Sequence, residues 1–291
     1  MCDDFTAEAE EANLARRGLN RREFSALGAS IALAGCAAGL GPKSAGSDVQ
    51  EKMVSITTDD GVADAFFVHP AKGAHAGVIM WPDIAGLRET KKIMARRLAA
   101  EGYAVLCVNP YYRGGPAPTF ESFSDYRTAE GQAKVAPLRA ALTPDAITRD
   151  ARAYVAFLRG DPAVDGKRGI GSHGYCMGGP FAVRAVAAEP VHVRAAASLH
   201  GAGLVSGAPD SPRRLVARTR AGFLFAIARN DDARQPDQKS ELQKAAAAAN
   251  RPAEVEVYPA DHGWCVPDSP SWDPDAADRA WQRMLALYET L

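Results

Sequence analysis

The sequence has no excess of charge of either sign, no pair of closely spaced cysteines and no internal repeat. Its 291 residues carry 34 Lys and Arg against 35 Asp and Glu, which leaves a formal net charge of −1. Because such a balance creates no field that would gather nucleic acid or anionic lipid, neither is expected as a partner. The five cysteines contain no C-x-x-C pair, so the spacing of a zinc site or of a thioredoxin-type redox pair is missing. A chain of this length can bury a full core.

Paired arginines stand before a short apolar stretch near the N-terminus. Arg21 and Arg22 precede residues 25–35, which are too few to cross a bilayer as a mature helix but enough for the core of a signal peptide. This order is typical of a twin-arginine export signal. The sequence LAGC at residues 33–36 also resembles a bacterial lipobox, in which Cys36 becomes the lipidated first residue after cleavage.

These features predict two parts of the chain. Residues 1–47 would form the leader, ending in a Gly-, Ala-, Ser- and Pro-rich tether, and residues 48–291 would form the folded domain. The product is expected in the periplasm of a bacterium or anchored to a membrane as a lipoprotein. Two alternatives stay open. Residues 32–34, Ala-Leu-Ala, fit a plain cleavage site without a lipid, and the leader could instead be an ordinary amphipathic helix.

Apolar periodicity after residue 48 predicts one α/β domain. Alternation around the turn residues Asp59, Asp60 and Gly61 predicts an N-terminal antiparallel hairpin. Continuous apolar runs predict buried parallel strands, and apolar residues at helical spacing predict the helices between them. The hairpin is expected at 53–58 and 62–69, later strands at 77–81, 104–108, 168–172, 193–199, 222–228 and 254–258, and helices at 88–100, 144–159, 181–188, 238–250 and 276–291. The pattern indicates a doubly wound, mostly parallel sheet.

One long connection interrupts this alternation of strands and helices. Residues 111–143 are polar, rich in Pro and Gly and without a clear period. A connection of this length inside a compact domain usually shapes a binding site or a lid, and the sequence leaves its role open.

The stretch KRGIGSHGYCMGG, residues 167–179, organises the domain. It predicts a strand, a sharp turn and a helix, and its turn matches the nucleophile elbow with a thiol in place of the usual Ser. Gly174 and Gly178 are small, as the close passage of the backbone at such a corner requires. Cys176 would lie at the N-terminus of the following helix, where the helix dipole favours the thiolate. A buried structural cysteine beside a Gly-rich turn is the alternative.

A thiol nucleophile needs a base in reach and a group that orients this base. In this kind of fold the order along the chain is nucleophile, acid, His. Of the six histidines, His262 alone lies on a loop directly after a strand that follows both the elbow and the acid strand. His200 ends the strand immediately after the elbow, where this order places no triad member, and His173 lies inside the elbow, where adjacent side chains point apart.

The orienting carboxylate is expected at the end of the strand 222–228. Asp231 and Asp232 both follow this strand. Because they are adjacent in the chain, only one of them can face the His loop. We favour Asp231 and keep Asp232 as the alternative. Asp261, next to His262, is a third choice.

With these residues in place, the chain resembles the dienelactone hydrolase family (carboxymethylenebutenolidases), cysteine hydrolases with an α/β-hydrolase fold. The G-Y-C-x-G-G elbow around Cys176, the His-Gly-aromatic loop at His262 and the acid after FLFAIA carry the resemblance. The stretches 78–90 and 107–113 are also similar to the family. The similarity extends over about residues 52–291, with the long connection only weakly matched.

The resemblance implies a Cys176-His262-Asp231 triad that attacks the carbonyl of an ester or lactone without a metal or another cofactor. It also implies an oxyanion hole formed by the backbone N–H groups of Met177 and Ile84. In the family a Glu contacts the resting thiol, and the matching residue here is Asp83, which is one methylene shorter. A helix-capping or loop carboxylate is the alternative interpretation of Asp83.

The chain departs from the family where the substrate is held. The founding enzymes bind a carboxylated lactone with an Arg shortly after the catalytic His, whereas residues 264–266 here are Trp, Cys and Val. The expected substrate is a small-molecule ester or lactone; the missing Arg argues against dienelactone itself without identifying the substrate, and the oligomeric state is open. Two other functions are weighed: a non-catalytic exported binding protein on a hydrolase scaffold, and a redox protein that uses Cys176 and Cys265.

Overall fold

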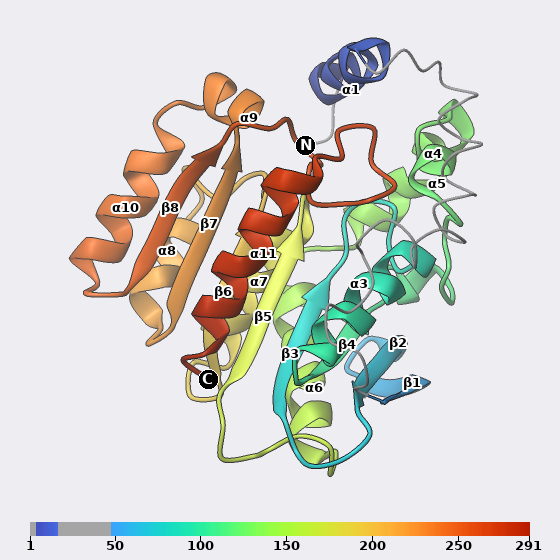
Figure 1. Ribbon diagram of the computed structural model, residues 1–291, viewed down its shortest axis with the longest axis vertical. Coiled ribbons are helices and arrows are strands. Elements are labelled where there is room, and N and C mark those ends of the chain that lie inside the picture. Colours follow the sequence, from blue (N-terminus) through green and yellow to red (C-terminus); the bar gives the residue numbers. More distant parts are fainter. Residues whose placement is uncertain (1–3, 17–47) are drawn as a thin grey trace.

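The protein has one eight-stranded sheet with helices on both faces (Figure 1). The computed structural model describes residues 4–16 and 48–291. The strand order is β1-β2-β4-β3-β5-β6-β7-β8; β2 runs against its two neighbours, and the other pairs from β4 to β8 are parallel. The strands are β1 (Val49–Thr58), β2 (Gly61–Pro70), β3 (Ala76–Trp81), β4 (Tyr103–Val108), β5 (Ile170–Tyr175), β6 (Val193–Leu199), β7 (Gly222–Ala228) and β8 (Ala253–Tyr258). The predicted hairpin and doubly wound sheet are confirmed.

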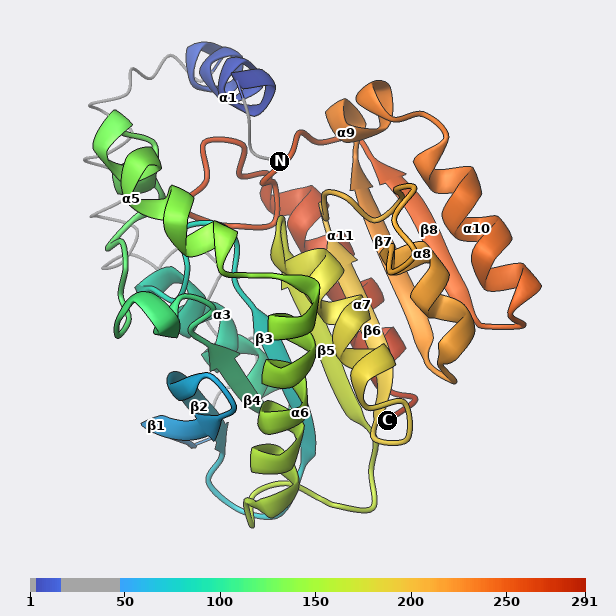
Figure 2. The same cartoon turned by 180° about the vertical axis from the view of Figure 1, so that it is seen from behind.

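Two groups of helices cover the sheet. The helices α3 (Glu89–Ala100) and α11 (Pro274–Tyr288) lie on the face seen in Figure 1. The helices α6 (Pro144–Gly160) and α7 (Gly178–Ala188) lie on the opposite face, in front in Figure 2, and α10 (Gln238–Ala248) packs against β8 beside them. Each face buries its own apolar core, so the central strands are covered on both sides, as expected for parallel strands with continuous apolar sequences.

Helix α6 shows how local sequence sets these elements. Pro144 occupies the first turn, where its missing N–H costs nothing, and the Thr143 side chain accepts a hydrogen bond from the Ala146 N–H at 3.2 Å. The buried residues of α6 recur at helical spacing and face the core, as predicted.

The connection 111–143 contains helical elements that its sequence did not reveal. They are η1 (Tyr112–Gly114), α4 (Phe123–Tyr126) and α5 (Ala129–Ala140). Ser122 and Asp125 form a capping box at the start of α4, and Thr128 caps α5, so polar cap residues rather than apolar periodicity define these short helices. A third, smaller apolar cluster joins them to the loop after β3; its buried members are Ile84, Ala85, Tyr111, Phe120, Phe123, Tyr126 and Val135.

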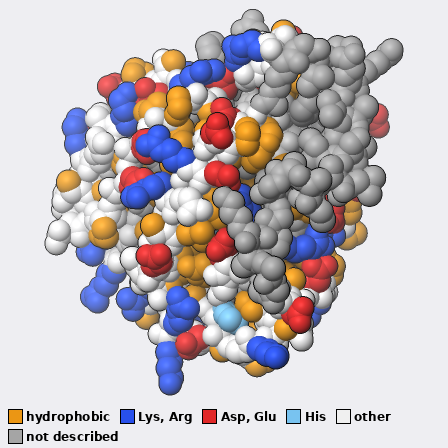
Figure 3. All heavy atoms as spheres, in the orientation of Figure 1, with side chains coloured by type: hydrophobic (Ala, Val, Ile, Leu, Met, Phe, Trp, Pro, Cys, Tyr) orange, Lys and Arg blue, Asp and Glu red, His pale blue; other side chains and the backbone are white. Residues whose placement is uncertain are grey.

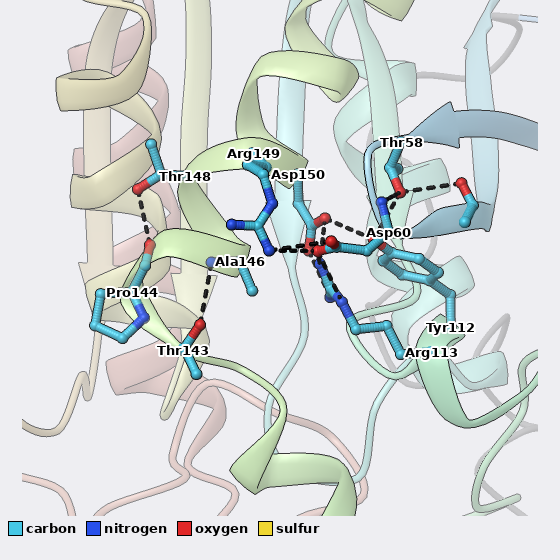
Figure 4. Close-up of polar contacts among 11 residues, drawn as sticks. Thr58, Asp60, Tyr112, Arg113, Thr143, Pro144, Ala146, Thr148, Arg149 and Asp150 are labelled. Carbon is cyan, nitrogen blue, oxygen red and sulfur yellow. Dashed lines mark hydrogen bonds and ion pairs between the residues drawn. The ribbon is translucent and has the colours of Figure 1, made fainter.

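Four charged residues tie the hairpin to α6 (Figure 4). Asp60 in the β1–β2 turn is paired with Arg113 at 2.6 Å and with Arg149 of α6 at 2.8 Å. Arg113 also donates to both oxygens of Asp150, at 2.8 and 2.9 Å. We call Asp60, Arg113, Arg149 and Asp150 the hairpin network. Tyr112 joins it by donating to Asp150 at 2.7 Å.

Part of the predicted leader is described. Helix α1 (Asp4–Arg16) lies within residues 1–47, and it contacts the domain: Leu14 is buried, Glu10 pairs with Arg127 at 2.9 Å, and Asn13 donates to Asp261 at 3.1 Å. Arg21, Arg22 and Cys36, on which the export and lipid predictions rest, lie outside the described residues. No helix in the described ranges is both long and apolar enough to cross a membrane.

Acidic and basic side chains are interspersed over the described part of the face shown in Figure 3, in keeping with the near-zero net charge of the chain. No single-sign region dominates that face.

Candidate active site

The sharp turn predicted around Cys176 is present between β5 and α7. Cys176 has a backbone φ of 54°, in the left-handed region that side-chain-bearing residues rarely adopt. A Cβ atom on Gly174 would lie 2.0 Å from the Gly178 carbonyl oxygen, and one on Gly178 would lie 2.5 Å from the Trp81 and Pro82 carbonyl oxygens. Only glycine fits at either position. The strained corner is therefore built by close backbone approach, as the nucleophile-elbow pattern predicts.

The backbone N–H of Cys176 is held by the neighbouring strand β6. It lies 3.1 Å from the Leu199 carbonyl oxygen and 3.1 Å from Nδ1 of His200. Cys176 itself is almost fully buried, at 4% exposure, and Met177 occupies the N-cap position of α7. The sulfur thus lies beside the positive end of a helix, which stabilises a thiolate.

His262 and Asp231 come together at the ends of β8 and β7. Nδ1 of His262 lies 2.6 Å from Oδ2 of Asp231, and the His262 backbone N–H donates to the Asn230 side chain at 2.9 Å. Asp232 instead accepts two contacts from Lys239, at 2.7 and 2.8 Å. Asp261 pairs with Arg229 at 2.7 Å. Of the three carboxylates that the sequence left open, the one that bonds His262 is Asp231.

Burial and nearby charge shift the pKa of His262 in opposite directions. Burial opposes the imidazolium, but the charges of Asp231 and Cys176, and a hydrogen bond to each, hold the pKa of His262 well above its usual range. Cys176, His262 and Asp231 form one hydrogen-bonded chain at the carboxyl end of the sheet.

Ile84 and Met177, which reach the site from different elements, meet at the hydroxyl of Tyr111. This hydroxyl donates to the Ile84 carbonyl oxygen at 2.8 Å and lies 3.4 Å from Sδ of Met177. Ile84 follows β3 and Met177 follows Cys176, so Tyr111 of the long connection joins the two loops from which backbone donors are expected.

Asp83 belongs to a buried cluster of charges. Arg88 donates to both of its oxygens, at 2.8 and 3.1 Å, and Lys91 pairs with it at 2.8 Å. Arg88 also pairs with Asp268 at 2.6 Å. Burial opposes the charge on Asp83, yet Arg88 and Lys91 hold its pKa far below the usual range. We call Asp83, Arg88, Lys91 and Asp268 the site network. The predicted contact of Asp83 with the resting thiol stays a prediction.

Two residues that the sequence analysis did not assign to the site, His200 and Asp268, lie at it in the structure. His200 lies against His262, with ring centroids 4.8 Å apart, and burial together with the charge of His262 keeps its pKa well below the usual range. Its Nε2 atom is buried without a hydrogen-bond partner among the described residues. Asp268, the second of these residues, pairs with Arg88 at 2.6 Å. His173 contacts Tyr288 at 2.9 Å, and burial lowers its pKa to about 3.

Cys107, Cys176 and Cys265 are buried, and none of them forms a disulfide among the described residues. Burial raises the pKa of Cys107 to about 12 and that of Cys265 well above its usual range, so both stay protonated and poorly reactive. In the described ranges no group of three or more His, Cys, Asp and Glu side chains is arranged to hold a metal ion.

Comparisons with known proteins agree with this architecture. The model of the dienelactone hydrolase family matches residues 63–291. A carboxymethylenebutenolidase of a Pseudomonas species is 28% identical over 222 residues, covering 76% of this chain and 87% of the relative. Two solved structures share the fold. A dienelactone hydrolase-like promiscuous phosphotriesterase from metagenomic libraries has a TM-score of 0.68 at 21% identity, covering 83% of this chain and 98% of that one. A dienelactone hydrolase from Anabaena variabilis has a TM-score of 0.61 at 16% identity, covering 84% and 99%.

Proposed function

The chain belongs to the dienelactone hydrolase family and is a lactone or ester hydrolase, and we propose that it acts through Cys176 as nucleophile, His262 as acid and base, and Asp231 as the group that orients His262. The observation that carries this proposal is the hydrogen-bonded chain from Cys176 through His262 to Asp231, with its 2.6 Å bond between Nδ1 and Oδ2. Imidazole oriented by a buried carboxylate beside a nucleophile is the geometry that acyl transfer requires.

The first half of the reaction forms an acyl-enzyme. The Cys176 thiolate attacks the carbonyl carbon, and the electron pair of the C=O bond moves to oxygen, where the N–H groups of Ile84 and Met177 would stabilise the negative charge. When the tetrahedral intermediate collapses, the bond to the leaving oxygen breaks and the His262 imidazolium gives that oxygen its proton. The product is a thioester on Cys176, with His262 neutral.

The second half returns the enzyme to its starting state. His262 takes a proton from water, the hydroxide attacks the thioester carbonyl, and the Cys176 thiolate leaves again as the C–S bond breaks. Asp231 keeps its negative charge throughout and favours the imidazolium in both steps.

We further propose that the substrate carries no carboxylate beside its reacting bond. No Arg follows His262 at residues 264–266, and the nearby cations Arg88 and Lys91 are already paired with Asp83 and Asp268. A substrate carboxylate in this region would therefore have no cation left to compensate its charge.

The test uses a small aryl ester and iodoacetamide. Cys176→Ala should abolish turnover, and iodoacetamide should abolish it in the unchanged protein with the label on Cys176. Cys265→Ala, which removes another buried thiol, is the matched control and should keep most activity. Full activity in Cys176→Ala would refute the proposal. Saturable ligand binding without turnover of any ester or lactone would favour the alternative of a non-catalytic exported binding protein.

We also propose that residues 1–47 direct export to the periplasm, either with lipidation of Cys36 or with simple cleavage of the leader. The paired arginines and the LAGC sequence support this proposal. Mass measurement of the mature N-terminus in the native bacterium distinguishes a lipidated Cys36 from simple cleavage. An intact Met1 would contradict both.

A further inference from the structure

Arg88 connects the loop after β3 with the loop that carries His262. We propose that Arg88 is a positioning residue: through Asp83 and Asp268 it holds the loop that presents the Ile84 N–H in register with the catalytic His loop. This inference rests on the proposed function, because it assigns Arg88 a part in the same acyl transfer.

One guanidinium group binds two carboxylates from distant parts of the chain. It donates from Nη1 and Nη2 to the two oxygens of Asp83, at 2.8 and 3.1 Å. It donates from Nε and Nη2 to the two oxygens of Asp268, at 2.7 and 2.6 Å. Two parallel N–H···O bonds to each carboxylate fix the distance and the relative orientation of the two side chains.

At the first carboxylate, these bonds define the turn that contains Ile84. Oδ1 of Asp83 accepts from the Ala85 N–H at 3.0 Å, and the Asp83 carbonyl oxygen accepts from the Gly86 N–H at 2.9 Å. Arg88 itself donates to the Gly86 carbonyl oxygen at 3.2 Å. Since Ile84 lies inside this turn, the direction of its N–H depends on where Arg88 holds Asp83.

At the second carboxylate, Asp268 belongs to the segment that follows His262, and it also receives a hydrogen bond from the start of α4. The Phe123 N–H donates to Oδ2 of Asp268 at 3.2 Å, and the Phe123 ring lies 5.8 Å from the guanidinium carbon of Arg88. Arg88 is therefore the point where the loop after β3, the His262 loop and the long connection meet.

The site network is balanced in charge and closed to water. Its two cations and two carboxylates are between 0% and 5% exposed. Loss of Arg88 alone would leave two carboxylates against Lys91, so a single variant would confuse a lost tether with a buried uncompensated charge. Removing Arg88 and the charge of Asp268 together leaves one balanced pair, Asp83 with Lys91 at 2.8 Å.

The deciding variant is therefore Arg88→Met with Asp268→Asn. It keeps charge balance and an acceptor for the Phe123 N–H, but it has no link between the two loops. For the aryl ester we expect kcat to fall about 10- to 100-fold while KM changes by less than about threefold, because misplacement of one oxyanion donor affects the transition state more than the bound substrate.

A second readout separates positioning from general damage. Alkylation of Cys176 by iodoacetamide displaces iodide from carbon and creates no oxyanion, so it reports the thiolate and His262 but not the Ile84 N–H. The alkylation rate of the double variant should stay within about threefold of the unchanged protein. A wild-type kcat in the folded double variant would overturn the inference, and so would an equal fall in kcat and in alkylation, because that result would mean that the elbow itself had been disturbed.

The matched control lies in the hairpin network. Arg113→Met with Asp150→Asn also removes one doubly bonded, part-buried ion pair and leaves a balanced one, Asp60 with Arg149, and it should keep kcat within about twofold. Cys176→Ala distinguishes a failure of the proposed function from a failure of the role assigned to Arg88. If that variant stays active, the proposed function fails; if it is inactive while the Arg88 double variant is fully active, only the present inference fails.

Discussion

The site network and the hairpin network have the same composition but differ in what they connect. Each holds two arginine or lysine cations against two aspartates. The site network joins loops that follow different strands at the carboxyl edge of the sheet. The hairpin network joins the β1–β2 turn to α6 and to η1, the short helix that follows β4 (Figure 4). The adjacent residues Tyr111 and Tyr112 contact different regions, since Tyr111 donates to Ile84 in the loop after β3 and Tyr112 donates to Asp150 of the hairpin network.

Their burial also differs, and this difference predicts what each does. The members of the site network are at most 5% exposed, whereas in the hairpin network only Asp150, at 1%, is as buried; the exposed fractions of Arg113, Asp60 and Arg149 are 16%, 26% and 36%. Exposed partners can move and exchange their hydrogen bonds with water, so they stabilise weakly and position little. Buried, doubly bonded partners hold one geometry and are costly to break. We therefore expect changes in the site network to affect catalysis and changes in the hairpin network to affect stability alone.

The largest effect on kcat is expected at Asp231, the carboxylate that bonds His262. Asp231→Asn should lower kcat about 10²- to 10⁴-fold, because the imidazolium loses the carboxylate that stabilises and orients it. Asp232→Asn is the matched control: its carboxylate bonds Lys239 instead of His262, so kcat should change less than about twofold. Steady-state rates with the aryl ester measure both. Equal losses in the two variants would contradict the assignment of Asp231.

The same variant tests the pH dependence. Burial alone lowers the pKa of His262, and the charges of Asp231 and Cys176 raise it above the usual range. His262 therefore contributes stability that is full below its ordinary pKa of about 6.5 and is lost as pH rises through the raised value. In Asp231→Asn the alkaline limb of the kcat/KM profile should move to lower pH. An unchanged alkaline limb would show that Asp231 does not set this titration.

Single arginine variants should separate the two networks by their effect on unfolding. Arg88→Met leaves two buried carboxylates against one lysine, and we expect it to lower the free energy of unfolding by about 3–5 kcal/mol. Arg113→Met leaves Asp150 short of a partner, but Tyr112 still donates to it, so the expected loss is about 1–3 kcal/mol. Urea unfolding measures both. A larger loss in Arg113→Met would reverse the ranking that burial predicts.

Sequence patterns predicted most of the fold because strands and helices are defined by apolar residues that are close in the chain. The elbow and the His loop were also visible, since Gly174, Gly178 and the residues around His262 form short local motifs. The bond between Arg88 and Asp268 has no such signal: the two residues are 180 positions apart, and neither their spacing nor their type points to the other. The helices within residues 111–143 were missed because polar caps, and not apolar periodicity, define them.

The smallest and most discriminating prediction concerns the adjacent tyrosines. Tyr111→Phe removes only the hydroxyl that donates to the Ile84 carbonyl oxygen at 2.8 Å, so the loop after β3 keeps its packing but loses one orienting bond. We expect kcat to fall about 3- to 10-fold with the free energy of unfolding lowered by about 1 kcal/mol. Tyr112→Phe removes a hydroxyl that donates to Asp150 at 2.7 Å and lies 2.8 Å from Thr58. This variant should lower the free energy of unfolding by about as much or slightly more, with kcat unchanged.

Rates and urea unfolding on both variants compare two nearly identical deletions one residue apart. If kcat falls equally in both, position relative to the site does not matter and the division between the two networks is wrong; if it falls only in Tyr111→Phe, the difference must come from the loop that Tyr111 holds, because the lost group and its size are the same.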